Sequence, residues 1–145
     1  MNLEYQTNSS GVNWEELRQD LVKDEFHNGR TSKQLQISFE NSQVQVYVFD
    51  GERCIGTARA LSDGVCNAYV VDVRTQTGYR QRGIASRMME KIISRCPGQH
   101  IYLFTDDAVD FYKKNGFTER PVGLEIISGQ WLQNDSLGQP RTNLC

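Results

Sequence analysis

The segment YVVDVRTQTGYRQRGIASRMMEKII, residues 69–93, decides the fold of this chain. Its first part, up to Val73, is an apolar and largely β-branched run that predicts a buried strand. A turn follows at Thr77, and a basic loop then leads past Gly83 into residues with helical spacing. Three apolar residues of this last part fall on one helical stripe: Ile84, Met88 and Ile92. The segment therefore predicts a strand, a loop and a helix in immediate succession.

This succession is suited to binding a phosphate group. The first turn of a helix has free backbone N–H groups and a partial positive charge. Gly83 lets the backbone approach an anion closely, and Arg80 and Arg82 add full positive charges. The two commonest nucleotide loops, G-x-x-x-x-G-K-[ST] and G-x-G-x-x-G after a strand, are both missing from the sequence. The loop reads R-x-x-G-x-A instead.

A second informative string, AVDFYKKNGF, occupies residues 108–117, just after another strand-like run. With the R-x-x-G-x-A loop it resembles the GNAT superfamily of acyl-CoA-dependent N-acetyltransferases, in the order and spacing of that family. The resemblance covers roughly residues 44–124. The sequence departs from the common family pattern at Thr77, where Pro is frequent, at Ala85, where Gly is frequent, and at Thr105, where Asn is frequent.

The resemblance implies an α/β (α+β) fold. Its mixed, mostly antiparallel sheet would have six to seven strands with about four helices, and the central strands would splay apart. Residue patterns predict helices over 14–26, after Thr31, over 83–95 and over 108–114. They predict strands over 3–5, 44–49, 54–61, up to Val73 and over 100–105, with weaker candidates over 117–122 and 125–132. We expect a single domain over 1–132 and a polar tail over 133–145.

The resemblance also implies which residues contact the coenzyme. The pantetheine arm would lie along the strand that ends the apolar run, and the diphosphate would lie on the loop and the start of the helix. A hydroxyl contact is implied where the family often has Asn. These positions are Val73, Thr75, Arg80, Gln81, Arg82, Gly83, Ile84, Ala85, Ser86 and Thr105. Ordinary core packing accounts equally well for the side chains of the strand residues, since the coenzyme contacts would use the main chain.

Tyr112 is the candidate catalytic acid, because the resemblance places it near the thioester sulfur, where it would protonate the departing thiolate. The alternative is a tyrosine that simply lies between core and surface. A thiol has a pKa of about 8.5 and a tyrosine of about 10, so this help is modest, roughly 10²-fold. The proton of the amine needs a separate acceptor. Asp72 is one candidate base, Glu125 and His27 are weaker ones, and a water relay stays open.

Composition limits the classes of function. The chain has 145 residues and a net charge of −2, which does not call for nucleic acid as a partner. No apolar run approaches the roughly 20 residues that span a bilayer, and the first residues lack the pattern of a signal peptide. We therefore expect a cytoplasmic protein without a membrane partner. The cysteines form no C-x-x-C pair, so no metal is expected, and Cys54 and Cys66 are predicted to be buried apolar residues.

The sequence thus predicts direct transfer of an acyl group, most simply acetyl, from acetyl-CoA or another acyl-CoA to a primary amine. A longer acyl chain, or a peptide amine in place of a small amine, stays open. One rival is a non-catalytic CoA-binding module, and another is a toxin-like acyltransferase directed at a macromolecule. Asp106 and Asp107 suit either a helix cap or attraction of a cationic acceptor. Both a monomer and a homodimer fit the sequence.

Overall fold

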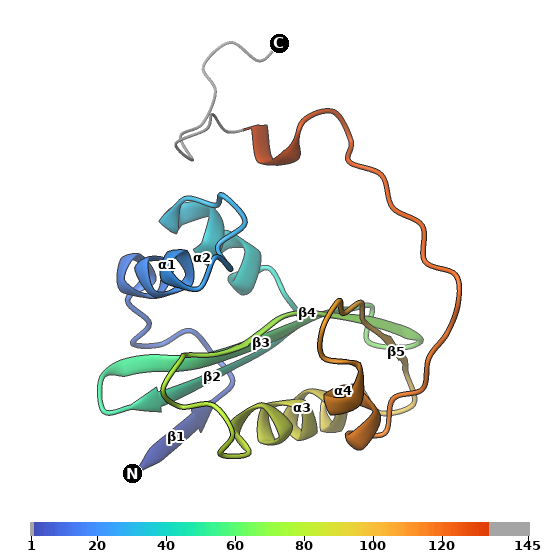
Figure 1. The fold of residues 1–145 in the computed structure, drawn as a ribbon, viewed down its shortest axis with the longest axis horizontal. Helices are drawn as coiled ribbons and strands as arrows, with labels where there is room; N and C mark the ends of the chain where they lie inside the picture. Colours follow the sequence, from blue (N-terminus) through green and yellow to red (C-terminus); the bar gives the residue numbers. More distant parts are fainter. Residues whose placement is uncertain (1, 134–145) are drawn as a thin grey trace.

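The computed structural model describes residues 2–133, which form a sheet with helices on both faces (Figure 1). The strands are β1 (Leu3–Gln6), β2 (Val44–Asp50), β3 (Arg53–Ser62), β4 (Asn67–Thr75) and β5 (His100–Tyr102). The helices are α1 (Trp14–Lys23), α2 (Ser32–Glu40), α3 (Ile84–Ser94) and α4 (Val109–Lys114), with a short 3-10 turn at Trp131–Gln133. Of the predicted tail over 133–145, residues 134–145 lie outside the described residues.

The five strands lie in the order β1-β2-β3-β4-β5. The first four are antiparallel neighbours, and β5 is parallel to β4, to which it is connected through α3. Helices α1 and α2 cover one face of the sheet, and α3 covers the other (Figure 1). The predicted fold class is confirmed, with five strands among the described residues rather than six or seven.

Helix ends follow local signals. Asn13 accepts a hydrogen bond from the backbone N–H of Glu16, and Thr31 forms a complete capping box with Gln34, as both patterns predict. Helix α1 ends earlier than predicted, because Glu25, just after its end, has φ of +56° and leaves the helical conformation.

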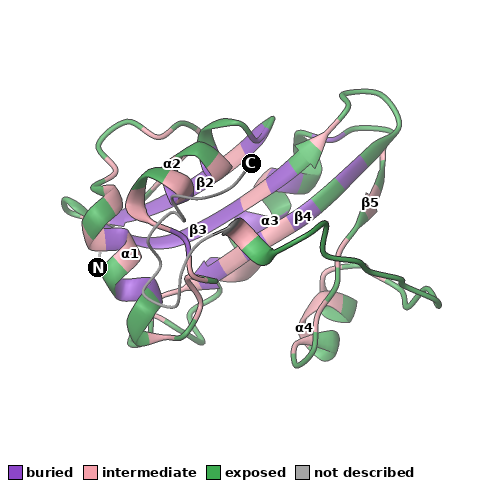
Figure 2. Cartoon of the chain, turned by 90° about the horizontal axis from the view of Figure 1, so that it is seen from above, coloured by how far each residue is buried: buried purple, intermediate pink, exposed green. Residues whose placement is uncertain are grey.

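The sheet separates two apolar cores. Strand β2 contributes to both: Val46 and Val48 pack toward α3, while Tyr47 and Phe49 pack toward α1 and α2. This alternation between two covered faces explains why the strand reads as a continuous apolar run. Helix α3 adds its predicted stripe to the first core, as Ile84, Met88 and Ile92 are all buried. Figure 2 shows the buried residues concentrated in the strands and on the inner faces of the helices.

Strand β4 contains a β-bulge at Asp72. Arg59 of β3 pairs with Val71 and Thr57 pairs with Arg74, so β4 has one more residue than β3 between these two pairs. Asp72 lies in this interval and has φ of +56°. An extra residue reverses the alternation of side chains. Before the bulge Val70 points into the core under α3; after it, Val73 does so, and Asp72 turns toward α1 and α2.

Strands β4 and β5 separate soon after they pair. Their register ends at Tyr69 opposite Tyr102, whereas β4 continues to Thr75. The predicted strand over 100–105 is therefore too long, since it ends at Tyr102. The separation confirms the expected splay of the central strands and leaves one edge of residues 70–75 without a neighbouring strand among the described residues.

The strands predicted over 117–122 and 125–132 are wrong. Residues 118–130, here called the C-terminal arm, run as exposed chain outside the sheet, and Leu124 and Ile126 are 91% and 93% exposed (Figures 1 and 2). A strand requires a hydrogen-bonding neighbour, and β5 offers an edge of only three residues. Pro121 removes a further donor.

A buried ion cluster joins the α1–α2 layer to β4. Arg30 donates to both carboxylate oxygens of Asp72 from Nη1 and Nη2, each at 2.9 Å, and Arg59 Nε donates to Oδ2 at 2.7 Å. The side chains of Arg30 and Asp72 are only 6% and 4% exposed. A paired arrangement of this kind satisfies the carboxylate completely.

Replacing Arg30 by Met should lower the free energy of unfolding by about 3 kcal/mol, because it leaves a buried carboxylate with half of its partners. Lys33→Met on the exposed surface of α2 removes the same charge and should have little effect. Chemical denaturation monitored by circular dichroism compares the two. Equal losses of stability in the two variants would contradict this account of the cluster.

Candidate functional site

Residues 76–83, here called the phosphate loop after the role that the sequence predicts for them, connect β4 to α3. The loop starts with a hydrogen bond from Gln76 N to Ile55 O at 2.8 Å and a turn in which Tyr79 N donates to Gln76 O at 3.0 Å. Three of its residues have positive φ: Gly78 at +100°, Gln81 at +62° and Gly83 at +77°. A non-glycine residue in this region is strained, and such strain concentrates in ligand-binding loops.

The N-terminus of α3 is open to a ligand. Gly83 is its N-cap residue and no side chain caps it among the described residues. A Cβ at Gly83 would meet nothing within 4 Å, so the space above it is empty of protein. Gln81, Arg82 and Gly83 are exposed, whereas Ile84 anchors the helix in the core at 2% exposure. The uncapped first turn therefore offers backbone N–H groups and a partial positive charge to an anion.

The two loop arginines are held in different ways. Arg80 donates from Nε to Thr75 O at 3.0 Å and lies 3.4 Å from the carboxylate of Asp24 through Nη2. Arg82 lies over the ring of Tyr79, 5.9 Å from its centroid. Both guanidinium groups therefore lie on the loop that leads to Gly83, which is where the sequence predicts a phosphate site.

The strand residues predicted to contact a coenzyme lie at the splay. Val73 packs its side chain against the core under α3, which leaves its main chain as the group available to a ligand. Thr75 has a buried hydroxyl oxygen with no hydrogen-bond partner in the described part of the chain. A buried hydroxyl without a partner is costly, and a bound ligand or water would satisfy it.

Tyr112 lies on α4, half-buried between the rings of Phe111 and Phe117 at centroid distances of 5.0 and 5.8 Å. Burial raises the pKa of Tyr112 above its usual value, and the charge of Asp107 adds to the rise. No hydrogen bond to its hydroxyl occurs within residues 2–133. The group is thus a protonated, unengaged phenol at neutral pH.

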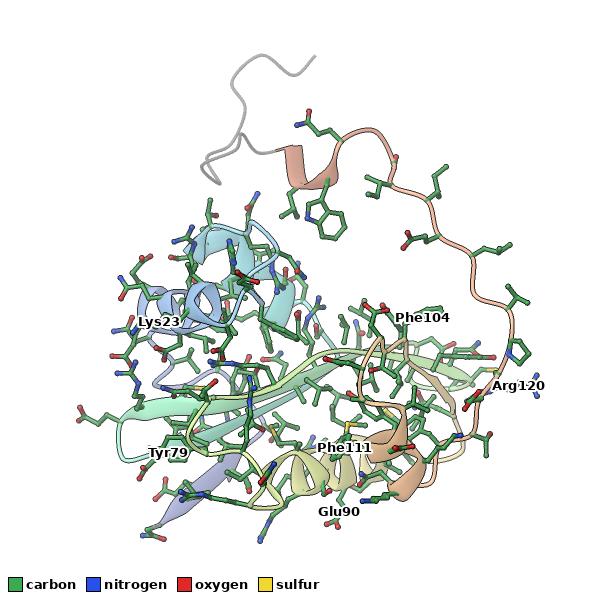
Figure 3. All side chains as sticks on the ribbon, in the orientation of Figure 1. Lys23, Tyr79, Glu90, Phe104, Phe111 and Arg120 are labelled. Atoms are coloured by element: carbon green, nitrogen blue, oxygen red, sulfur yellow. The ribbon has the colours of Figure 1, made fainter. Side chains whose placement is uncertain are left out.

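Contacts around α4 connect the helix of Tyr112 to the first turn of α3. Thr105 accepts a hydrogen bond from the backbone N–H of Ala108 at 3.0 Å, so its hydroxyl braces the start of α4. Asn115 donates to Ser86 Oγ at 3.5 Å and to Phe111 O at 2.9 Å, which links α4 to the first turn of α3. Figure 3 shows Phe111 at the junction of the two helices. Sequence reasoning missed Asn115, although it lies in the string that suggested the family.

Asp72 lies apart from this arrangement, on the face covered by α1 and α2. Burial alone would raise the pKa of Asp72, but the hydrogen bonds and charge of Arg30, with those of Arg59, outweigh it and hold the pKa below its usual value. Both of its oxygens already accept hydrogen bonds from arginines. Such a carboxylate is a poor proton acceptor, and the geometry assigns it to the fold of β4.

The other candidate groups have mixed surroundings. His27 has a buried Nδ1 without a partner in the described residues, while Glu125 lies on the exposed arm. Among the described residues no side chain caps α4 at its N-cap residue Ala108, so neither Asp106 nor Asp107 does the capping expected of them, and both aspartates stay exposed. Cys54 is buried, as predicted. Cys66 is exposed, contrary to prediction, because it lies in the bend that connects β3 to β4.

The C-terminal arm crosses from α4 to the α1–α2 layer (Figures 1 and 3). Near its start it passes so close to Phe104 that a Cβ at Gly123 would overlap with that ring. Near its end, Trp131 Nε1 donates to Asn28 O at 2.9 Å. The arm and the first two helices are thus joined on the face of the sheet that Phe104 occupies.

The described residues show neither a metal centre nor a membrane-spanning helix. Within residues 2–133, no three or more His, Cys, Asp or Glu side chains are grouped so that they could hold a metal ion. No helix of that part is both long enough and apolar enough to cross a bilayer.

Comparisons with known proteins agree with this geometry. Residues 12–117 match the model of the Acetyltransferase (GNAT) family. The histone acetyltransferase TAP1 of Glycine max is 37% identical over 78 residues, 51% of this chain and 34% of the relative. The uncharacterized N-acetyltransferase ycf52 of Porphyra purpurea is 27% identical over 129 residues, 83% of this chain and 74% of the relative.

The chain spans about a third of the length of the first curated relatives it matches. Among solved structures, a predicted acetyltransferase from Clostridium acetobutylicum with acetyl-CoA superposes with a TM-score of 0.65 and 19% identity, over 87% of this chain and 96% of that one. Similarity at this identity establishes the shared fold. The family match over most of the chain goes further, and the chain belongs to the GNAT family of acetyltransferases.

Proposed function

We propose that this protein transfers an acyl group, most simply acetyl, from acyl-CoA to a primary amine. The observation that carries the proposal is the open, uncapped N-terminus of α3 behind Gly83, directly after a strand that has separated from β5. The diphosphate would lie on the backbone of residues 81–86, with Arg80 and Arg82 beside it. The pantetheine arm would follow the free edge of β4 at Val73 and Thr75. Family membership supports acetyl-CoA as the co-substrate.

In this arrangement the amine attacks the thioester carbonyl directly, without a covalent enzyme intermediate. The backbone N–H of Val73 would donate to the oxyanion that forms. As the carbon–sulfur bond breaks, Tyr112 gives its proton to the departing thiolate and is later reprotonated by water. The proton of the attacking amine passes to water, since Asp72 is committed to its arginines.

The pocket for the acceptor amine would lie between the α1–α2 layer and the C-terminal arm. Neither segment carries a sequence motif that identifies the acceptor. We keep a small amine as the first candidate. A peptide amine is the alternative, which the similarity to a protein named as a histone acetyltransferase favours. A cytoplasmic location stays a prediction, and a monomer and a homodimer both stay open.

Gly83→Ala should weaken acyl-CoA binding by about tenfold. The change strains a residue with φ of +77° and places a methyl group where the diphosphate would approach. Gly98→Ala is the matched control, because Gly98 has φ of +73°, has open space around it, and lies beyond the other end of α3. Calorimetric titration with CoA separates the two variants. Equal weakening by both would show that strain alone accounts for the effect.

Tyr112→Phe should lower kcat by roughly 10²-fold while changing the Kd of acyl-CoA much less, since only the proton donor is removed. Release of free thiol with a panel of amines measures kcat. Tyr102→Phe is the control, because it removes a hydroxyl that bonds to His100 on the exposed edge strand. An unchanged kcat for Tyr112→Phe at every pH would remove Tyr112 from this role.

The pH profile of kcat/KM should rise through neutrality and show no decline below about pH 10. An alkylamine with a pKa of about 10.4 is neutral in only about one molecule in two thousand at pH 7, so deprotonation increases the rate. The raised pKa of Tyr112 keeps the phenol protonated above pH 10, so it cannot cause a falling limb at lower pH. A decline near pH 8 that persists in Tyr112→Phe would require another acid.

A further inference from the structure

Asp24 accepts hydrogen bonds from the phosphate loop and from the strand before it. It is the C-cap residue of α1, outside every motif that suggested the family. Its Oδ2 accepts from Arg74 Nε at 3.1 Å and lies 3.4 Å from Arg80 Nη2, while its Oδ1 accepts from Thr77 Oγ1 at 3.1 Å. One carboxylate therefore contacts the strand before the loop, the first turn of the loop and its first arginine.

The contact with Arg74 holds Asp24 itself in place. Arg74 is a buried β4 residue whose side chain is 3% exposed, and its Nη2 also donates to Asp20 O at 3.3 Å, one turn earlier in α1. The hydrogen bond from Arg74 is the main reason that the pKa of Asp24 lies below its usual value. The carboxylate is therefore ionised and fixed at neutral pH, and the positive charge of Arg74 balances it.

The contacts with Thr77 and Arg80 fix the loop. Thr77 and Arg80 are both exposed. Gly78, which lies between them, has φ of +100°, and a glycine restrains the backbone less than any other residue. Tyr79 adds a second anchor by donating to Asp50 Oδ2 at 2.6 Å. In Figure 3, Lys23 at the end of α1 and Tyr79 in the loop lie at the same end of the molecule. Helix α1 thus supplies the fixed support against which the loop is set.

We propose that Asp24 is a positioning residue for coenzyme binding, which sets the phosphate loop by holding Thr77 and Arg80. This inference rests on the proposed function. Because a mobile loop must be ordered when it binds, a loop already fixed by Asp24 binds the diphosphate more tightly. The effect of losing the Thr77 contact should be confined to donors that carry the diphosphate, because the contact of Asp24 with β4 runs through Arg74 and does not involve Thr77.

Thr77→Val is the primary test, because it removes the hydroxyl donor and leaves the Asp24–Arg74 pair intact. Its Kd for CoA should rise about fivefold to tenfold, and Thr77→Ser, which restores the hydroxyl, should bind like the parent protein. Ser9→Ala is the matched control: Ser9 is a partly exposed residue whose hydroxyl donates to Glu40 Oε2 at 2.6 Å, away from the loop. Asp24→Asn is the second variant and should weaken CoA binding at least as much.

The decisive readout compares two donors. With acetyl-CoA, kcat/KM should fall about fivefold to tenfold in Thr77→Val through KM. With acetyl-pantetheine, which lacks the diphosphate, it should stay within twofold. Equal losses with both donors would mean a merely structural role, and would overturn the inference.

Hydrogen exchange of residues 77–83 in the ligand-free protein gives a measurement that does not depend on turnover. Exchange should be faster in Thr77→Val and Asp24→Asn than in the parent. Unchanged exchange, or an unchanged Kd for CoA in both variants, would overturn the positioning role alone. A parent protein that binds no CoA would overturn both this inference and the proposed function, so the two failures are distinguishable.

Discussion

The ion cluster of Arg30, Asp72 and Arg59 is the interaction on which the rest of the arrangement depends. It stabilises Asp72 at a positive φ in the middle of β4, a conformation that is unfavourable for an aspartate without a specific reason. The bulge at this position reverses the alternation of side chains, which places Val73 in the core and turns its neighbours toward α1. The same stretch of β4 then runs free of β5, so one buried carboxylate helps to shape the edge along which the acyl donor would lie.

Charge also connects the two layers at the end of β4. Arg74 bonds to the carboxylate of Asp24, and Arg53 donates to Asp20 Oδ1 at 2.6 Å. Both aspartates belong to the end of α1, and both arginines to the sheet. The α1–α2 layer is thus attached to the sheet by apolar packing and by hydrogen-bonded ion pairs, which fix the position of the layer relative to the sheet. Apolar contacts tolerate small sliding movements, whereas hydrogen-bonded ion pairs set direction as well as distance.

The sequence predicts what is local. The caps at Asn13 and Thr31, the stripe of Ile84, Met88 and Ile92, and the uncapped start of α3 all follow from spacings of a few residues. It does not predict the partners of Asp24, because Arg74 and Thr77 lie 50 and 53 positions away along the chain. The role of Asp72 as the base depended on the face of the sheet to which its side chain points. The bulge determines that face, and the sequence does not show the bulge. The strands expected after residue 117 had apolar residues at suitable positions, but strand formation requires an edge to pair with.

The two apolar clusters lie on opposite faces of the sheet. The sides proposed to bind the amine and the acyl donor are therefore supported by different clusters. Leu17, Leu35 and Phe39 fill the cluster under the first two helices, and Met88 and Ile92 fill the cluster under α3. Changes of side-chain volume in the first cluster would reshape the layer proposed to face the amine and would leave the packing behind the proposed diphosphate site in place. Under this proposal, a chain built in this way could acquire a new acceptor by accumulating substitutions on one side, while the chemistry of the donor is inherited unchanged.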